Sequence, residues 1–325
     1  MKNGILHSSL LKYIVKRLLM AVFVLILVSI IVFVTVRLCP GDPVLAKIGP
    51  HGDNSSENYA RIATELGLDK PMAVQYLIWL RDFVRGDFGK SLLNGKDVRP
   101  IVMEKLPPTI ELVVVSMVFA ILLAIVLGVT SAIHKDTWYD QLVRFISTGN
   151  LAIPNFCVAL ILILLLCVHN KVFPSRGYVS FHENPVMNLR YMFLPCLTLV
   201  LNEQASLTRY IRSEMLEILG SNYVRTAKAK GLPRSGVYYR HAFKNVLVTV
   251  ITLVGMRLGQ LAGGAVILEQ MFSWSGVGWL LYSSIVNQDY PAVQAVVLII
   301  AAIMVLCNMI SDILYAAVDP RIKLD

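Results

Sequence analysis

The sequence predicts an all-α protein that crosses a membrane six times, and three observations support this fold class. Of the 325 residues, 56% are hydrophobic and only 16% are charged, whereas soluble domains carry about 25% charged residues. Uncharged runs of about 20 residues recur along the chain, and each can cross a hydrocarbon core as a helix. The net charge of +9 comes from Lys and Arg gathered in short loops, as in the cytosolic loops of membrane proteins. We therefore expect contact with membrane lipid and no binding of nucleic acid.

The first expected span is the uncharged run Leu18–Val36, which follows the basic residues Lys12, Lys16 and Arg17. Its 19 residues exceed the apolar region of a signal peptide, which has about 7–15 residues, and no A-x-A cleavage site follows. We expect an uncleaved helix, so residues 1–36 comprise a cytosolic N-terminus and the first span.

Residues 37–108 form the longest polar region and are expected on the outer side, since loops of this length cross regardless of their charge. A serine at position 55 or 56 can begin one helix, which Gly67 ends. Asp69 and Pro71 begin a second helix, and Gly86 closes it. Such a loop can contact a soluble partner or cap the helical bundle, and the sequence leaves both open.

Residues 109–318 are expected to form the transmembrane core, with five spans. Three of these spans are uncharged runs of 22, 24 and 21 residues, namely Leu112–Ile133, Phe145–Val168 and Pro291–Ser311. Each is long enough to cross the bilayer without carrying a charge into it.

The other two spans each involve an ionisable residue. Tyr191–Asn202 has only 12 residues before Glu203, so this crossing must hold Glu203 inside it or near its end. Asn245–Leu268 is long enough but holds Arg257 at its middle, where an arginine costs about 2.5–3.5 kcal/mol on insertion scales. Arg257 can line a pathway and attract an anionic group, or it can form a structural ion pair with Glu203 or Asp312.

Glycines recur at four-residue spacing along the run that holds the arginine. Gly255, Gly259 and Gly263 share one helical face, and Gly264 follows. Faces of small residues let helices approach closely. We expect this face at a helix–helix or subunit interface rather than against lipid.

The distribution of Lys and Arg orients the chain. The head before the first span, the segment 209–244 and the tail 319–325 carry Lys and Arg, whereas residues 269–290 contain neither. The positive-inside rule therefore places both termini and the segment 209–244 in the cytosol. The loop 169–190 carries three basic residues on the outer side, which is a contrary signal.

Motifs of catalysis, metal binding and nucleotide binding are missing or incomplete. The five cysteines include no C-x-x-C pair, and the six histidines form no H-E-x-x-H pair. No G-x-S-x-G motif occurs. Gly86–Ser91 imitates a phosphate-binding loop but has two residues between its glycines, where that motif needs four. We expect no catalytic residue, no metal and no cofactor bound by this chain, and no ATPase activity of its own.

The segment 209–244 is the strongest signal for function. Helix formers stand on both sides of Gly231, and Pro233 follows, which predicts a helix, a glycine cap, a turn and a second helix. A structured, cationic loop of 36 residues is longer than a connection between two spans requires. We therefore favour a docking element for a soluble partner over a solvated loop.

This segment resembles the cytosolic loop of the permease subunits of ABC importers. In that family the loop carries the pattern Glu-Ala-Ala-x-x-x-Gly, which forms a coupling helix that docks on the ATPase. Gly231 and Ala227 match the glycine and the last alanine of the pattern. Arg225 and Thr226 stand in place of the glutamate and the first alanine. The dipeptide, oligopeptide and nickel branch has a version similar to Tyr223–Gly231.

Further motifs of the same branch follow in order along nearly the whole chain. They are Pro40–Pro43, Gly86–Gly89, Leu106–Thr109, Arg240–Asn245, Gly263–Ala265, Glu269–Gly278, Asp289–Pro291 and Asp319–Arg321. One departure is Ser275, where the branch usually has proline. Each motif is weak alone, and together they identify the chain as resembling the first permease of a heteromeric pair.

The resemblance implies a type I ABC importer permease fold in the bacterial cytoplasmic (inner) membrane. It implies a heterodimer with a homologous second permease, two cytosolic ATPase subunits that use ATP and Mg, and an extracytoplasmic substrate-binding protein. The residues implied in coupling to the ATPase are Tyr223, Arg225, Thr226, Ala227, Lys228, Gly231, Leu232, Arg234 and His241. The residues expected on the translocation pathway or at an interface are Arg257, Gly259, Gly263, Gly264 and Glu269.

The sequence leaves the cargo open. Short peptides are the first expectation, and nickel or a metal-chelate complex is the second. A secondary transporter driven by protons or ions is the alternative of another class. It would need acidic relays within the membrane, whereas Glu203 and Asp312 lie near span ends and no inverted repeat is visible.

Overall fold

In a computed structural model, the chain is a bundle of helices, as the uncharged runs predict. The structure describes residues 2–38, 43–48, 55–65, 67–233 and 235–318. Within these ranges the only strand-like pairing is a single bridge between Lys90 and Asp97. The helices, in chain order, are α1 (Lys2–Leu38), α2 (Pro43–Ile48), α3 (Ser56–Glu65), α4 (Met72–Val84), α5 (Val98–Ile133), α6 (Trp138–Ala152), α7 (Asn155–Leu162), the π-helical η1 (Ile163–His169), α8 (Pro185–Gly220), α9 (Asn222–Ala229), the π-helical η2 (Gly236–Ala242), α10 (Phe243–Phe272), α11 (Val277–Val286) and α12 (Tyr290–Val318).

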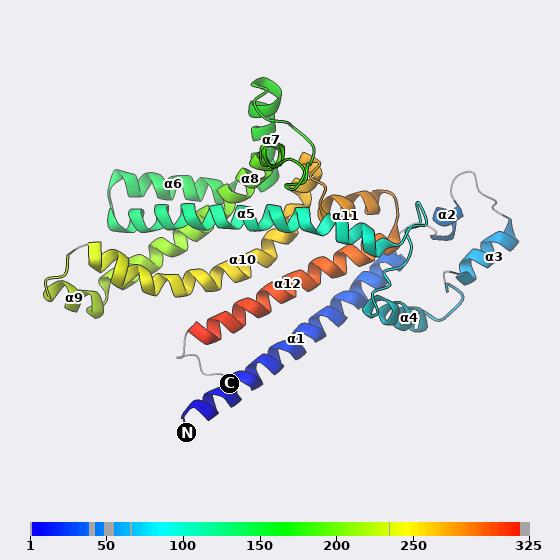
Figure 1. Cartoon of the computed structure of the whole chain (residues 1–325), viewed down its shortest axis with the longest axis horizontal. Coiled ribbons are helices and arrows are strands. Elements are labelled where there is room, and N and C mark those ends of the chain that lie inside the picture. The colour runs from blue at the N-terminus through cyan, green and yellow to red at the C-terminus, as the bar shows by residue number, and fades with distance from the viewer. Residues whose placement is uncertain (1, 39–42, 49–54, 66, 234, 319–325) are drawn as a thin grey trace.

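The long helices lie side by side and form the bundle (Figure 1). α1 contacts α12, α12 contacts α10, and α10 contacts both α5 and α8. The most extensive packing joins α5 to α8. At Gly128 of α5 an added Cβ would lie 2.7 Å from Cγ2 of Ile211, so only a glycine lets the two helices approach this closely.

Three helices are long and apolar enough to cross a membrane, namely Ile14–Leu38, Val98–Ile133 and Tyr290–Ile313. The pair Trp138–Ala152 and Asn155–His169 makes a fourth if both parts belong to one bent span. α8 and α10 have 36 and 30 residues, so they are about 54 and 45 Å long at 1.5 Å per residue. Their lengths suffice for a crossing, but their composition does not establish one. The all-α polytopic fold is confirmed, and the number of six spans stays a prediction.

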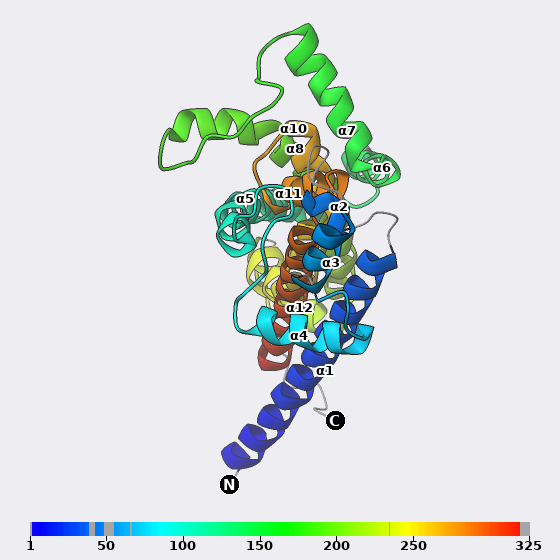
Figure 2. The ribbon, with the colours of Figure 1, turned by 90° about the vertical axis from the view of Figure 1, so that its right-hand side faces the viewer.

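A sharp bend divides the uncharged run Phe145–Val168. α6 ends at Ala152 and α7 begins at Asn155, and the two axes differ by 101°. Ile153 between them is extended, with φ −98° and ψ 124°, because the residue before a proline is disfavoured in the helical region. Pro154 is the N-cap of α7, and α7 projects away from the bundle (Figure 2).

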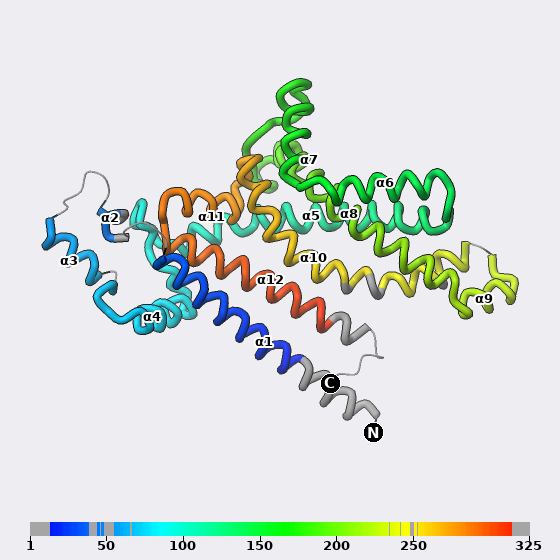
Figure 3. Tube along the Cα trace, turned by 180° about the vertical axis from the view of Figure 1, so that it is seen from behind, coloured from blue at the N-terminus to red at the C-terminus, as the bar shows by residue number. Residues whose placement is uncertain are grey.

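The polar region after α1 forms the two helices that the sequence predicts. α3 begins beside Ser55, whose hydroxyl oxygen accepts the N–H of Asn58 at 3.4 Å, and α4 begins directly after Pro71. Gly67 and Gly86 end these helices with φ of 66° and 88°. Both helices lie, with α2, at the end of the bundle opposite α9 (Figure 3).

A carboxylate ties this polar region to the bundle. Asp289, between α11 and α12, accepts a hydrogen bond from the Ser91 hydroxyl at 2.5 Å and another from the Leu92 N–H at 3.1 Å. Ser91 and Asp289 are both buried. The segment after α4 is therefore held against the start of α12.

Candidate functional site

The predicted cytosolic segment folds as a capped helix, a turn and a second helix. Ser221 is the N-cap of α9, and its hydroxyl oxygen accepts the N–H of Val224. At its other end Gly231 has φ of 77°, and its N–H donates to the Lys228 carbonyl at 3.0 Å. Leu232 donates to the Ala227 carbonyl at 3.4 Å, which completes a Schellman cap. The glycine cap that the sequence predicts is confirmed.

α9 has one apolar and one polar side. Val224 and Ala227 are buried and pack with Val237 of η2 and with the end of α8. The remaining predicted coupling residues of the helix and its cap point outward, and the exposed set is Tyr223, Arg225, Thr226, Lys228, Gly231 and Leu232. Arg234 and the side chain of His241 lie outside the described residues, as do the motifs at 40–42 and 319–321. The buried side anchors α9, and the exposed side is available to a partner.

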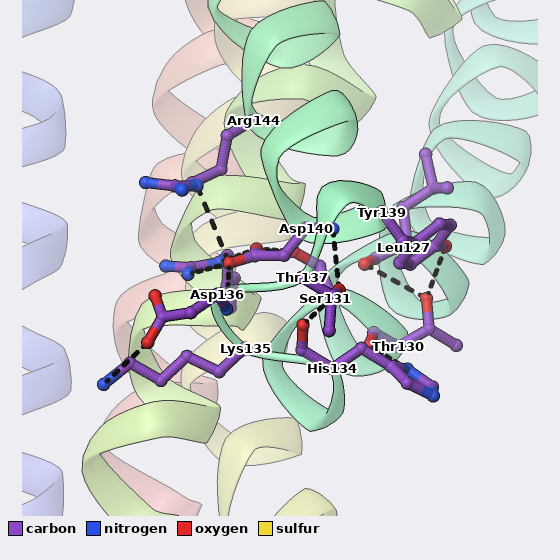
Figure 4. A network of polar contacts seen from close by, with 11 residues as sticks. Leu127, Thr130, Ser131, His134, Lys135, Asp136, Thr137, Tyr139, Asp140 and Arg144 are labelled. Atoms are coloured by element: carbon purple, nitrogen blue, oxygen red, sulfur yellow. Dashed lines mark hydrogen bonds and ion pairs between the residues drawn. The ribbon is translucent and has the colours of Figure 1, made fainter.

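A buried ion pair joins the helix that leads to α9 with the α5–α6 turn (Figure 4). Asp140, in the first turn of α6, has no exposed surface. Arg212 of α8 donates to both of its carboxylate oxygens, from Nε at 2.6 Å and from Nη2 at 2.7 Å. The Ser131 hydroxyl of α5 donates to Oδ1 at 2.5 Å. A buried carboxylate requires such partners, and a two-pronged guanidinium is the strongest.

Residues of the turn complete the environment of this carboxylate. The Asp136 N–H donates to Asp140 Oδ2 at 3.1 Å, and Thr137 caps α6 by accepting the Asp140 N–H. Arg144 lies farther off, with Nε 3.7 Å from Oδ2. The sequence alone does not reveal this cluster, because 72 residues separate Asp140 from Arg212. The sequence carries no specific signal for the pair, because Arg144 stands between Asp140 and its uncharged run, and Glu203 and Arg209 stand between Arg212 and its own.

Arg257 lies between α10 and α8 and makes hydrogen bonds rather than a close ion pair. Its Nη2 donates to the Ser206 hydroxyl of α8 at 2.7 Å, and Nη1 lies 3.5 Å from Oε1 of Gln260. Glu203 has one carboxylate oxygen that is buried with no hydrogen-bond partner among the described residues. The alternative of an ion pair with Asp312 is wrong, because Asp312 pairs with Arg17 of α1 at 2.8 Å. A pathway role for Arg257 stays a prediction.

The glycines of α10 fall into two groups. Gly255 packs so closely on Ser311 of α12 that a Cβ has no room, and a Cβ at Gly259 would lie 3.3 Å from the Met304 carbonyl oxygen. Both positions therefore serve helix packing within this chain. A Cβ added at Gly263 or Gly264 would meet no other side chain within 4 Å among the described residues, and the surface around these two glycines is available to another subunit or to cargo.

Glu269 lies inside the fold, where it caps α11. The side chain has no exposed surface, and Oε2 accepts the N–H groups of Gly278 and Trp279 at 2.7 and 3.1 Å. The Thr109 hydroxyl of α5 donates to Oε1 at 2.6 Å. A carboxylate at a helix N-terminus satisfies free N–H groups and favours the helix dipole. The place on a pathway or interface that the sequence suggests for Glu269 stays a prediction.

These features define a class of protein: an all-α polytopic membrane protein with an exposed, basic helix held at one end of the bundle. The family follows from comparison with known proteins. The family model of the binding-protein-dependent transport system inner membrane component matches residues 106–324, and the model of the N-terminal part of such membrane components matches residues 10–113. The chain belongs to this family, the permease subunits of ABC importers, as the motifs predict.

Several relatives match along almost their whole length. The oligopeptide transport system permease protein AppB of Bacillus subtilis (strain 168) is 39% identical over 314 residues, which cover 96% of this chain and 99% of that protein. A Brucella abortus (strain 2308) protein named as a peptide transport system permease is 38% identical, with 96% and 99% covered. A Sinorhizobium fredii (strain NBRC 101917 / NGR234) protein named as a peptide ABC transporter permease is 34% identical, with the same coverage.

Family membership settles the general role. The chain is a non-catalytic transport component of an importer, so it is not an enzyme. It is a multi-pass protein of the bacterial inner membrane. It works with an ATPase and a substrate-binding protein.

Proposed function

We propose that this chain is the first permease of a heteromeric pair and that it conducts short peptides inward. The observation that carries the proposal is α9, a capped helix that packs its apolar side on α8 and exposes its polar side. The beginning of α1 and the end of α12 lie at the same end of the molecule as α9 (Figure 1). This arrangement supports a cytosolic position for all three, which the basic residues of the sequence also favour.

α9 is the coupling helix in this proposal. The exposed side chains of Tyr223, Arg225 and Lys228 would contact one of two cytosolic ATPase subunits, which bind ATP and Mg in place of this chain. The arginine at 225 replaces the acidic residue of the family pattern. We therefore expect an acidic patch on the groove of the ATPase, since complementary charges steer association and fix its register.

Two connections would carry motion of α9 into the bundle. α9 follows α8 after the single residue Ser221. α8 is fixed to the α5–α6 turn by the Arg212–Asp140 pair. A docked coupling helix that moves with the ATPase would therefore move α8 and this turn as one unit. Switching between inward-facing and outward-facing states then follows from two alternative packings of rigid elements.

The partner permease and the cargo would meet two further surfaces. α7 and η1 project from the bundle and expose Leu160, Leu164 and Val168, and we assign this apolar surface to the second permease. Arg257, with Ser206 and Gln260 beside it, offers a cationic site for the carboxylate of a peptide. The relatives carry peptide or oligopeptide in their names, which favours peptides over nickel or a metal chelate.

Uptake by the reconstituted importer tests the proposal. The two permeases, the ATPases and the binding protein are placed in liposomes, and uptake of a labelled tripeptide is compared with uptake of radioactive nickel. We expect tripeptide uptake that needs ATP and that survives a protonophore. Uptake that a protonophore abolishes and that needs no ATP would support a secondary transporter instead. Uptake of nickel but not of tripeptide would contradict the assigned cargo.

A further inference from the structure

A groove between α6 and α8 gathers three arginines beside two aromatic side chains. Its volume is about 630 Å³, which is enough for a phosphate-bearing headgroup with part of its glycerol. Arg144, Arg209 and Arg212 line it, together with Phe145 and Tyr210. None of the described residues that line the groove is acidic.

The three arginines differ in how closely each is paired with a carboxylate of this chain. Arg212 is committed to Asp140 through two short hydrogen bonds. Arg144 reaches the same carboxylate only at 3.7 Å and keeps a half-exposed side chain. Arg209 is exposed and makes no ion pair within the ranges that the structure covers. Asp140 neutralises one of the three charges, so the groove retains a net positive charge of about two.

The groove also lies at the level expected for lipid headgroups. Phe145 is the first residue of an uncharged run, and Arg144 directly precedes it. Phe145 and Tyr210 are 78% and 47% exposed, and aromatic rings favour the interface between headgroups and acyl chains. Basic pockets between membrane helices on the cytoplasmic side are suited to anionic headgroups.

We propose that this groove binds the phosphate headgroup of an anionic phospholipid of the inner leaflet. Arg209 and Arg144 contact the phosphate, and the two aromatic rings contact the beginning of the acyl chains. The lipid lies against the helices joined by the Asp140–Arg212 pair, so it covers the cluster that braces α8. The site goes beyond peptide transport and rests on the proposed function only for its cytosolic orientation.

Lipid retention on the assembled importer tests the site without a transport assay. The complex is placed in nanodiscs of equal parts phosphatidylcholine and phosphatidylglycerol, released, and examined by native mass spectrometry. We expect the wild-type permease to retain phosphatidylglycerol in preference to phosphatidylcholine. Arg209→Gln should weaken this retention about fivefold, the effect of one basic residue near an anionic surface. Arg209→Lys should keep most of it, which separates loss of charge from loss of fold.

A control variant outside the groove and a competition with small phosphates test whether the retention is specific to this groove and to lipid. Lys135→Gln removes an exposed charge from the same turn but outside the groove, and it should leave retention unchanged. Excess inorganic phosphate or glycerol phosphate should fail to displace the lipid. Equal retention by wild type and Arg209→Gln, or an equal loss in Lys135→Gln, would overturn the proposal. Displacement of the lipid by the small phosphates would contradict the proposal and show that the groove binds anions without preference for a lipid.

Discussion

At the scale of single residues, the Asp140–Arg212 pair decides how α6 and α8 stand relative to each other. Asp140 is wholly buried, and the side chain of Arg212 is 17% exposed. Removing one member leaves an uncompensated charge inside the protein, and such losses cost about 3–5 kcal/mol.

We therefore expect Arg212→Gln to destabilise the detergent-solubilised protein by about 3 kcal/mol or more. Arg144→Gln is the matched control, because its ion pair with the same carboxylate is longer and half-exposed. Its loss should cost about 1 kcal/mol or less. Thermal unfolding of the two variants measures the difference, and equal melting temperatures would contradict a structural role for the pair.

Arg257 is the residue whose role in transport can be separated from assembly. Arg257→Gln and Arg257→Met remove the charge but keep a side chain of similar length, so both variants should assemble with the partner subunits. We expect them to lower peptide uptake, because the site for the peptide carboxylate is lost. Uptake and complex formation are measured in the same liposomes. Normal uptake by both variants would reject the pathway role and leave the Ser206 hydrogen bond as a packing feature.

Single residues were predictable where their role is local. The sequence predicts the positive φ of Gly231, because a helix that ends before a proline needs a residue suited to the left-handed region. It does not predict Asp140 with Arg212, or Glu269 with Thr109. These partners are 72 and 160 residues apart, and only the packing of the long helices brings them together.

At the scale of elements, the C-terminal cap of α9 can be disrupted by a single substitution at Gly231. Gly231→Val forces a β-branched side chain into φ of 77°, which costs about 1–2 kcal/mol. We expect membrane insertion to remain intact, peptide uptake to fall and ATP hydrolysis to become uncoupled from uptake. The ratio of peptide imported to ATP hydrolysed is the measurement.

Gly220→Ala is the control for this substitution. Gly220 ends α8 in a helical conformation, and a Cβ added there would meet open space. It lies on the same segment, so a general effect of added bulk would appear there too. Wild-type coupling in Gly231→Val would contradict the proposed role of the cap, and equal uncoupling in both variants would show that the effect is not specific to it.

The sequence predicts the limits of some helices but not the bend between two of them. Turn residues predict α3 and α4 with nearly correct limits, since each is bounded by serine, proline or glycine. For α9 they predict the end at Gly231, but not its start after Ser221. The 101° bend between α6 and α7 was not predicted. Hydropathy does not change across Pro154, so an uncharged run conceals where the chain turns.

At the scale of the whole molecule, the proposed orientation makes the two ends of the long axis an outer end and a cytosolic end. The region of α2, α3 and α4 lies opposite α9 (Figure 3). The sequence predicts this sidedness from loop charge, although it does not establish that α8 and α10 each make a full crossing. Both contain ionisable side chains, Glu203 in α8 and Arg257 in α10, and Arg257 donates a hydrogen bond to Ser206 of α8.

Labelling with a membrane-impermeant thiol reagent tests the sidedness. The five native cysteines are replaced, and one cysteine is introduced at Asn94 or at Thr226, both of which are exposed. In intact cells with a permeabilised outer membrane, we expect Asn94→Cys to react at once. Thr226→Cys should react only after the inner membrane is opened. The reverse pattern would invert the proposed orientation.

The cap on α11 constrains how this family member can evolve. An added Cβ at Gly276 would overlap the Glu269 carboxylate, and one at Gly278 would lie 2.5 Å from Cα of Val266. The same carboxylate supplies the acceptor for two N–H groups of α11 and for the Thr109 hydroxyl. Gly276 is therefore coupled to Glu269, since only loss of the acid makes room for a side chain at 276, whereas the Val266 backbone excludes a side chain at 278 in either case. Thr109 also accepts the Val277 N–H, so it should stay polar even in descendants that lose the acid. Substitutions at 269 and 276 should therefore be correlated along this lineage.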